Sequence, residues 1–277
     1  MSSATTSYEA GAADYDRLTG RWSRLYVSSL VSAAGVSAGD SVLDVAAGTG
    51  EAAVGLGSCV GAEGRILAVD LSPGMLRLAA SKLAGLPVRF AVMDGQRLAC
   101  PSGVFDAVVC QLGLMFFPEP LRGLEEFRRV LRSGGRLAVQ VWSRPDRVPF
   151  YGFLADALSR EFPEPQRAAL YQPSALADPD RLRALMSGAG FRDVSVTPER
   201  RRGSFESFEE YWEPIERGAS RLGQIYLGLT ESRRRVVREE VGRSMSPFQS
   251  GRRLVLEAEA FIGRGVKPDA REGTEGG

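Results

Sequence analysis

Hydrophobic runs and amphipathic stretches alternate along the first half of the chain from about position 41. The runs consist of Val, Ile, Leu, Ala and Phe, as expected of strands that are buried on both faces, and the stretches between them have helical spacing. The predicted strands are Ser41 to Ala46, Arg65 to Asp70, Val88 to Met93, Val104 to Gln111 and Arg136 to Trp142, and the predicted helices are Glu51 to Val60, a helix opened by Ser72 and Pro73, and Pro120 to Arg132. This alternation predicts an α/β fold with a parallel sheet and covering helices.

The segments on either side of this core have a different pattern. Before it, apolar residues recur at three and four positions from Trp22 to Ala33, which predicts an amphipathic helix. After position 143, prolines separate short helical pieces that are rich in aromatic residues. The elements predicted there are the helices Asp180 to Ala189, Phe205 to Ala219 and Glu231 to Ser244, and the strands Phe191 to Thr197 and Arg252 to Ile262.

This order of elements divides the chain into five parts. Residues 1–40 supply N-terminal helices over the ligand edge of the sheet, and residues 41–198 form the core. Residues 199–250 are too long for a turn and too apolar for a linker, so we predict a helical cap that holds the substrate. Residues 251–264 return to the sheet as its last strand, and residues 1–6 and 265–277 are expected to be mobile.

Composition excludes several classes of chemistry. The 277 residues include no histidine, which removes Ser-His-Asp and Cys-His pairs, histidine metal sites and the usual general base near neutral pH. The 35 basic and 34 acidic residues leave a formal charge of +1, spread over both halves, so we expect no nucleic-acid partner.

The cysteines and the start of the chain favour a cytoplasmic protein. Cys59, Cys100 and Cys110 have no ligand-like spacing, so we expect packing roles, no disulfide and no metal site. The first residues lack a basic and an apolar signal region, and no apolar run approaches the length of a membrane span.

Candidate chemistry gathers where the predicted strands end. The first strand breaks into Ala46-Ala47-Gly48-Thr49-Gly50, whose small residues let the backbone approach a ligand, although this segment also fits a loose dinucleotide pattern or a plain tight turn. Asp70 closes the second strand 22 residues after Gly48, the separation at which an acid reaches ribose hydroxyls; its alternative role is to cap the next helix. Asp94-Gly95 follows the third strand, where a carboxylate could contact an adenine. Together these motifs predict a cofactor that contains ribose.

Four segments in this order resemble class I S-adenosylmethionine-dependent methyltransferases, and within them the ubiquinone and menaquinone biosynthesis C-methyltransferase-like group. The segments are Asp44 to Gly50, Ala68 to Leu76, Phe105 to Val109 and Arg129 to Leu137. The resemblance covers about residues 15 to 142, with weaker support at Ala189-Gly190-Phe191. The chain departs from the pattern at Ala46 and Ala47, where many members carry glycine first, and this narrows the space near the amino-acid end of the cofactor.

The resemblance implies a Rossmann-like fold with a seven-stranded, mostly parallel sheet whose last strand is antiparallel, and S-adenosyl-L-methionine as cofactor. Residues 41–198 would then be the cofactor-binding core. By the resemblance, the cofactor-binding residues are Tyr15, Ala46, Gly48, Asp70, Leu71, Met75, Asp94, Gly95 and Gln111. In this set, Ala46 and Gly48 would hold the methionine portion with indirect support from Asp44. Leu71 and Met75 would flank the adenine, and the backbone carbonyl of Gln111 would meet the amino group beside the sulfonium. Tyr15, and Trp22 unless it only packs its helix, would fold over the methyl donor.

We predict a methyltransferase that acts at carbon or oxygen of a hydrophobic small molecule, such as a phenol, quinol or secondary metabolite. The sulfonium already activates the methyl group, so the protein chiefly positions the reactants and excludes water. The predicted acceptor pocket consists of Leu112, Leu114, Met115, Phe116, Phe117, Phe150, Tyr151, Phe153, Tyr211, Trp212 and Tyr226. Candidates for a base, where one is needed, are Asp14, Tyr15, Asp16, Tyr151, Tyr211 and Tyr226, and no catalytic residue is singled out.

Two alternatives remain open at this point. A protein could bind S-adenosylmethionine and catalyse another reaction, such as a cyclisation, because the motifs report cofactor binding and not turnover. A nicotinamide oxidoreductase is less favoured because Asp44, Asp94-Gly95 and the Arg132 to Gly135 turn are not part of that pattern. The oligomeric state is also open, with a homodimer as one option.

Overall fold

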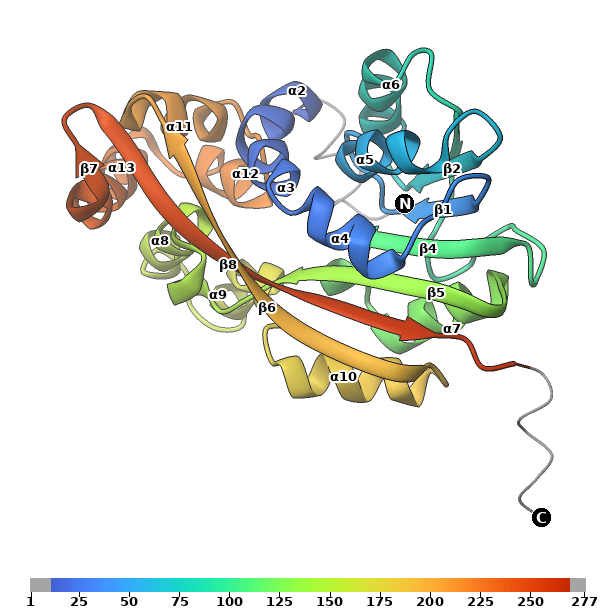
Figure 1. Cartoon of the computed structure of the whole chain (residues 1–277). Helices are drawn as coiled ribbons and strands as arrows, with labels where there is room; N and C mark the ends of the chain where they lie inside the picture. The colour runs from blue at the N-terminus through green and yellow to red at the C-terminus, as the bar shows by residue number, and fades with distance from the viewer. Residues whose placement is uncertain (1–10, 270–277) are drawn as a thin grey trace.

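One sheet of eight strands organises the part of the chain that the computed structural model describes, residues 11–269 (Figure 1). The strands are β1 (Ser41–Val45), β2 (Arg65–Asp70), β3 (Val88–Val92), β4 (Phe105–Gln111), β5 (Leu131–Trp142), β6 (Arg192–Phe205), β7 (Gln249–Ser250) and β8 (Arg253–Val266). Their order is β3-β2-β1-β4-β5-β8-β6, and the two-residue β7 pairs with β8 outside this path. Strands β1 to β5 are parallel, whereas β8 is antiparallel to both of its neighbours β5 and β6. The predicted α/β fold with an antiparallel last strand is confirmed, and β7 is an addition to the seven expected strands.

Helices cover both faces of this sheet (Figure 1). The α-helices are α2 (Ala12–Tyr15), α3 (Arg21–Arg24), α4 (Val27–Ala34), α5 (Glu51–Val60), α6 (Pro73–Lys82), α7 (Pro120–Val130), α8 (Pro149–Ser159), α9 (Gln166–Leu170), α10 (Pro179–Gly188), α11 (Phe208–Glu216), α12 (Arg221–Leu227) and α13 (Glu231–Met245). A π-helical turn, η1 (Asp16–Gly20), joins α2 to α3, and short 3-10 turns η2 to η5 cover Leu114–Phe116, Pro145–Arg147, Gln172–Ser174 and Ser246–Phe248.

The alternation of side chains along the central strands produces two hydrophobic cores. In β1, Val42 belongs to a core with residues of α4, α5 and α6, whereas Leu43 and Val45 belong to the larger core on the other face, which includes residues of α7 and α10. The same alternation occurs in β4, where Ala107 faces the first core and Val108 the second. Strands buried on both faces explain why the sequence shows continuous apolar runs rather than a polar alternation.

The last two long strands extend beyond the rest of the sheet. Strand β6 continues to Phe205 and stays paired with β8 up to Leu254, so that the two strands form a long twisted ribbon leading to α11, α12 and α13 (Figure 1). The predicted strand end at Thr197 and the predicted start of the cap at residue 199 are therefore too early. Residues 199–205 are strand, and the cap helices follow them.

Other boundaries also differ from the prediction. The helix expected from Trp22 to Ala33 breaks at Leu25 and Tyr26 into α3 and α4. The helix expected over Phe205 to Ala219 is α11, and a separate, unpredicted α12 follows it. Residues 265 and 266 belong to β8 rather than to a tail, while residues 1–6 and 270–277, also expected to be mobile, lie outside the described residues.

Candidate active site

The loop after β1 has the tight backbone that its small residues predict. Ala46 has a φ of +56° and Gly48 a φ of +54°, and helix α5 begins directly afterwards at Glu51. On one side the loop is closely packed, since a Cβ added at Gly113 would lie 2.3 Å from the Ala46 Cβ. On the other side it is open, because a Cβ added at Gly48 would meet no atom within 4 Å. The loop therefore leaves its Gly48 backbone accessible to a ligand.

Asp70 lies beside this loop at the end of β2. Its carboxylate accepts hydrogen bonds from the backbone N–H of Gly48 at 2.9 Å and of Ser72 at 2.8 Å. Burial raises the pKa of Asp70 despite these hydrogen bonds. The capping role belongs to Ser72, whose Oγ accepts from the N–H of Met75 at 3.3 Å, so Asp70 is not the cap of α6.

The residues expected around an adenine are divided between surface and core. Leu71 leaves 52% of its surface exposed next to Asp70, which is unusual for leucine and suits a contact with a ligand. Met75 is buried in the protein. Asp94 accepts from the N–H of Gln96 at 2.8 Å, and a Cβ at Gly95 would lie 2.5 Å from Phe117, so the turn after β3 requires glycine there.

The carboxyl group of Asp44 is fully buried below the same loop. Neither of its oxygens has a hydrogen-bond partner among the described residues. Burial, together with the nearby charge of Asp70, raises the pKa of Asp44 to about 8. A buried carboxyl group without partners is costly unless a ligand supplies a donor or a positive charge, so Asp44 marks this edge of the sheet as a place for a cationic group.

The N-terminal segment covers the loop and is held by polar contacts. Asp16 accepts from the Thr49 hydroxyl at 2.9 Å and from Lys82 at 2.7 Å, and Lys82 also pairs with the buried carboxylate of Glu51. Burial opposes ionisation of Asp16, but its contacts with Glu51, Lys82 and Thr49 outweigh this effect and lower its pKa. These contacts fix η1 against the start of α5 and the end of α6.

Gln111 and Trp22 also connect the N-terminal segment to the core. The side-chain amide of Gln111 donates to the Ser23 carbonyl and to the Gln140 side chain, both at 2.9 Å. Trp22 is completely buried and stacks on Phe150, with ring centroids 4.9 Å apart. The packing interpretation of Trp22 therefore holds.

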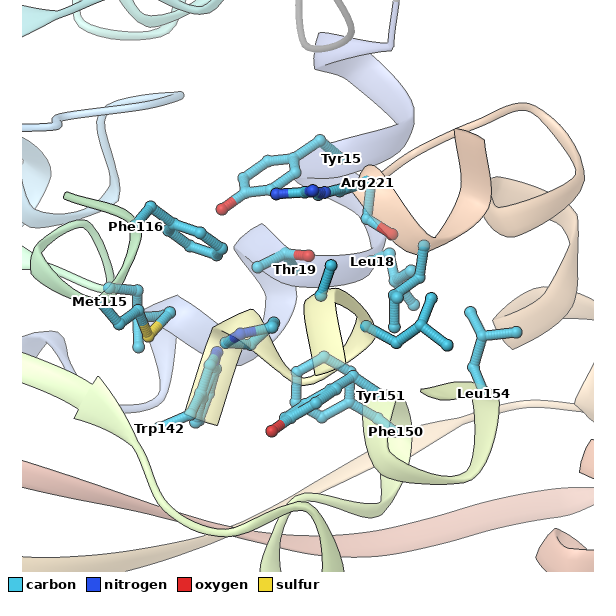
Figure 2. Close-up of a pocket in the computed structure, with 16 residues that line it drawn as sticks. Tyr15, Leu18, Thr19, Met115, Phe116, Trp142, Phe150, Tyr151, Leu154 and Arg221 are labelled. Carbon is cyan, nitrogen blue, oxygen red and sulfur yellow. The ribbon is translucent and has the colours of Figure 1, made fainter. Parts of the chain in front are cut away.

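A cavity of about 60 Å³ lies between the N-terminal segment, the loop after β4, α8 and α12 (Figure 2). Its walls are Tyr15, Leu18, Thr19, Leu112, Met115, Phe116, Trp142, Phe150, Tyr151, Leu154, Ala169, Leu170, Pro173, Ser220, Arg221 and Leu222. The cavity is next to the loop after β1, because Leu112 and Met115 lie on either side of Gly113, which packs on Ala46. At this volume it is smaller than the ~150 Å³ that encloses benzene, so an aromatic acceptor requires its walls to move apart.

Five residues of the predicted acceptor pocket line this cavity: Leu112, Met115, Phe116, Phe150 and Tyr151. The other six do not line it; they are Leu114, Phe117, Phe153, Tyr211, Trp212 and Tyr226. The last three are buried in the packing between α11 and α12, where the Trp212 and Tyr226 rings lie 5.3 Å apart. The prediction missed Trp142 and Arg221, which come from the end of β5 and from the unpredicted α12.

Three of the tyrosines proposed as a base, Tyr151, Tyr211 and Tyr226, have a raised pKa. Tyr151 donates or accepts at the Ser174 hydroxyl, and Tyr211 donates to the Phe150 carbonyl at 2.8 Å. Burial raises the pKa of Tyr151, Tyr211 and Tyr226. Within residues 11–269, no group of three or more His, Cys, Asp or Glu side chains is arranged to hold a metal ion.

Comparisons with known proteins agree with this arrangement of loops. A methyltransferase domain model matches residues 42–135. The ubiquinone/menaquinone biosynthesis C-methyltransferase UbiE of Azotobacter vinelandii is 32% identical over 209 residues, which cover 68% of this chain and 81% of that protein. UbiE of Marinomonas sp. is 34% identical over 135 residues, or 47% of this chain, and the match spans about half (54%) of its length. The Bacillus halodurans protein BH2331, assigned to the methyltransferases, shares the fold with a TM-score of 0.59 and 20% identity over 87% of this chain and 98% of its own.

Together with these relatives, the fold and the loops at the carboxyl ends of β1 and β2 identify an enzyme that uses S-adenosylmethionine. The chain belongs to the class I S-adenosylmethionine-dependent methyltransferases, and its cofactor is S-adenosylmethionine. The residues present fit this cofactor, because the unpartnered carboxyl group of Asp44 and the open backbone at Gly48 are suited to a cationic ligand that approaches the main chain. No helix in the described part of the chain is long and apolar enough to cross a membrane.

Proposed function

We propose that this protein transfers a methyl group from S-adenosylmethionine to a hydrophobic small molecule bound in the cavity of Figure 2. The observation that carries the proposal is the contact between the two sites: the loop after β4 lines the cavity with Leu112 and Met115 and packs on the cofactor loop through Gly113. A molecule in the cavity would therefore lie next to the bound cofactor. Because the relatives are named as C-methyltransferases, we propose carbon as the methylated atom, with oxygen as the alternative.

We assign the cofactor contacts as follows. Asp70 binds the ribose hydroxyls, Leu71 packs on the adenine with support from Met75, and Asp94 and Gly95 form the turn that contacts its edge. Ala46 and Gly48 hold the amino-acid portion above Asp44. The backbone carbonyl of Gln111 contacts the amino group, and Tyr15 covers the methyl donor from the N-terminal segment.

The protein's part in the reaction is positioning and exclusion of water. When bound, the cofactor supplies an electrophilic methyl group, and alignment of the reacting atoms is worth up to about 7–11 kcal/mol. The apolar walls, including Phe116, Trp142 and Phe150, hold the acceptor in a dry environment. The N-terminal segment, fixed through Asp16 and Lys82, closes the site over the cofactor.

The division of labour between core and cap is part of the proposal. Residues 41–198 bind the cofactor, and the segments that wall the cavity, including the cap at Ser220, Arg221 and Leu222, select the acceptor. We also propose a cytoplasmic site of action and no nucleic-acid partner, supported by cysteines that form no disulfide within the described residues and by a net charge close to zero.

The test compares two carboxylates at opposite ends of the sheet. Asp70→Asn should weaken S-adenosylmethionine binding at least tenfold, because the asparagine loses charged hydrogen bonds worth roughly 1.5–3 kcal/mol. Asp106→Asn is the matched control, since Asp106 also accepts from a backbone N–H, that of Ser41 at 2.7 Å, but lies at the start of β4 and far from the loops. Calorimetric titration measures the affinity of each variant for S-adenosylmethionine. If the two variants bind it equally well, Asp70 does not contact the cofactor.

A second measurement tests turnover. The protein is incubated with S-adenosylmethionine carrying a labelled methyl group and with small-molecule extracts, and products are analysed by mass spectrometry. A labelled product supports methyl transfer. Cofactor binding together with an unlabelled, rearranged product would favour the alternative of a cyclisation.

A further inference from the structure

Arg221 is the one charged residue among the sixteen that line the cavity. It is the first residue of α12, whose start is fixed because the Ser220 Oγ accepts from the N–H of Gly223 at 3.2 Å. In Figure 2 the Arg221 guanidinium lies beside Tyr15, on the side of the cavity opposite Trp142, Phe150 and Tyr151. A cation thus faces a chamber whose other walls are mostly apolar.

The guanidinium of Arg221 has no ion-pair or hydrogen-bond partner among residues 11–269. Three other arginines of the N-terminal segment and the cap are paired: Arg17 with Glu213 at 2.9 Å, Arg21 with Glu210, and Arg217 with Glu213. Arg221 is exposed at the cavity, and its donors are available to a ligand there.

Two of the other polar groups of the wall are engaged within the protein. The Tyr151 hydroxyl is engaged by Ser174, and the Ser220 hydroxyl caps its own helix. A neutral apolar acceptor would leave the exposed guanidinium of Arg221 in contact with water only, whereas a carboxylate would pair with the planar guanidinium in a two-point contact. The wall thus combines aromatic surface at one end with an available guanidinium at the other.

We propose that Arg221 binds the carboxylate of an aromatic acid, whose ring lies against Phe116, Trp142 and Phe150, so that the acceptor class is aromatic carboxylic acids. This inference rests on the proposed function, because it names the substrate of the same cavity. Arginine is suited to the task because its fork of donors matches the carboxylate, whereas lysine presents a single point of charge.

The experiment uses two probes of nearly equal shape, 1-naphthoate and the neutral 1-naphthamide. Their dissociation constants are measured by calorimetry with the full-length protein, with and without S-adenosylhomocysteine. The wild type should bind naphthoate at least tenfold more tightly than naphthamide, and Arg221→Gln should reduce this ratio to about one while leaving the naphthamide affinity unchanged. Arg221→Lys should give an intermediate ratio.

Arg235→Gln is the matched control, because Arg235 is also an exposed arginine of a cap helix and has no ion-pair or hydrogen-bond partner among residues 11–269, but it does not line the cavity. It should keep the wild-type ratio. The proposal is overturned if the wild type binds both probes equally or binds neither, if Arg221→Gln retains the preference, or if the control loses it to the same extent.

Failure of this inference can be distinguished from failure of the proposed function. Probe binding requires no turnover, so an Arg221-dependent preference for naphthoate without detectable methyl transfer would support the inference and count against the proposed reaction. Methyl transfer to a neutral acceptor, with no preference for naphthoate, would support the proposed reaction and count against the inference.

Discussion

The buried carboxyl group of Asp44 should make stability depend on pH in a specific way. Its pKa is about 8 in the folded protein, against about 3.9 for an unfolded chain. Between these values the folded state binds one proton more than the unfolded state, so the free energy of unfolding falls as pH rises, by about 1.4 kcal/mol per unit. Above pH 8 both states are ionised at this position and the loss stops.

The substitution Asp44→Asn removes this proton and keeps the shape of the side chain. Relative to the wild type, the variant should gain about 2.5 kcal/mol between pH 5 and pH 7, and the gain should level off above pH 8. The contribution of Glu51, whose pKa is also raised by burial, is present in both proteins and cancels in the difference. The absence of histidine leaves few other groups to titrate in this range.

Urea unfolding of both proteins without cofactor, at pH 5, 6, 7 and 8, measures the difference. A stability difference that stays constant across this range, or that changes in the opposite direction, would refute the argument that Asp44 is protonated in the folded protein. In addition, a cation bound near Asp44 should ionise it, so cofactor binding at pH 7 should release up to about one proton. Calorimetry in buffers of different ionisation enthalpy detects this release, which Asp44→Asn should abolish.

Three further substitutions test the packing of the site. Gly113→Val should weaken cofactor binding and lower the melting temperature, because even a Cβ there would lie 2.3 Å from that of Ala46; unchanged affinity in a titration would show that the loops are not coupled. Trp212→Ala should cost about 3–5 kcal/mol in chemical denaturation, as expected for a large core aromatic ring, and a stable variant with altered acceptor KM alone would contradict its burial. Asp16→Asn should raise the KM for S-adenosylmethionine several-fold by loosening the contacts of η1 with Thr49 and Lys82, and proteolysis of the N-terminal segment should become faster; equal rates in both proteins would count against this role.

The cofactor loops were predictable from sequence because each follows directly from a buried strand. The small residues after Val45 and the acid at position 70 lie next to each other once β1 and β2 pair, and the pairing of Val45 with Val69 brings them to the same edge. The hydrogen bond from the Gly48 N–H to Asp70 was not predicted and is seen only in the structure.

The cavity was less predictable because its walls come from segments that are far apart in sequence. Trp142 looked like the end of a strand, and nothing local indicates that it turns toward the cavity. Helix α12 did carry a signal, since Leu222, Ile225, Tyr226 and Leu229 recur at three and four positions after a serine cap. That spacing would have found the helix, and with it the position of Arg221, but not the absence of a partner for its charge.

The paired extension of β6 and β8 separates the cap helices from the strands whose ends carry the loops after β1 and β2. After a register shift between Arg192 and Ser195, the two strands stay in register from Ser195 opposite Arg264 to Phe205 opposite Leu254, and the whole cap is inserted between Phe205 and Arg253. Residues added to or removed from the cap leave this register unchanged, because they enter the chain beyond its last pair. The cap is therefore an exchangeable part, and the ribbon is a grafting point at which caps of related enzymes can be joined to this core without redesigning the sheet.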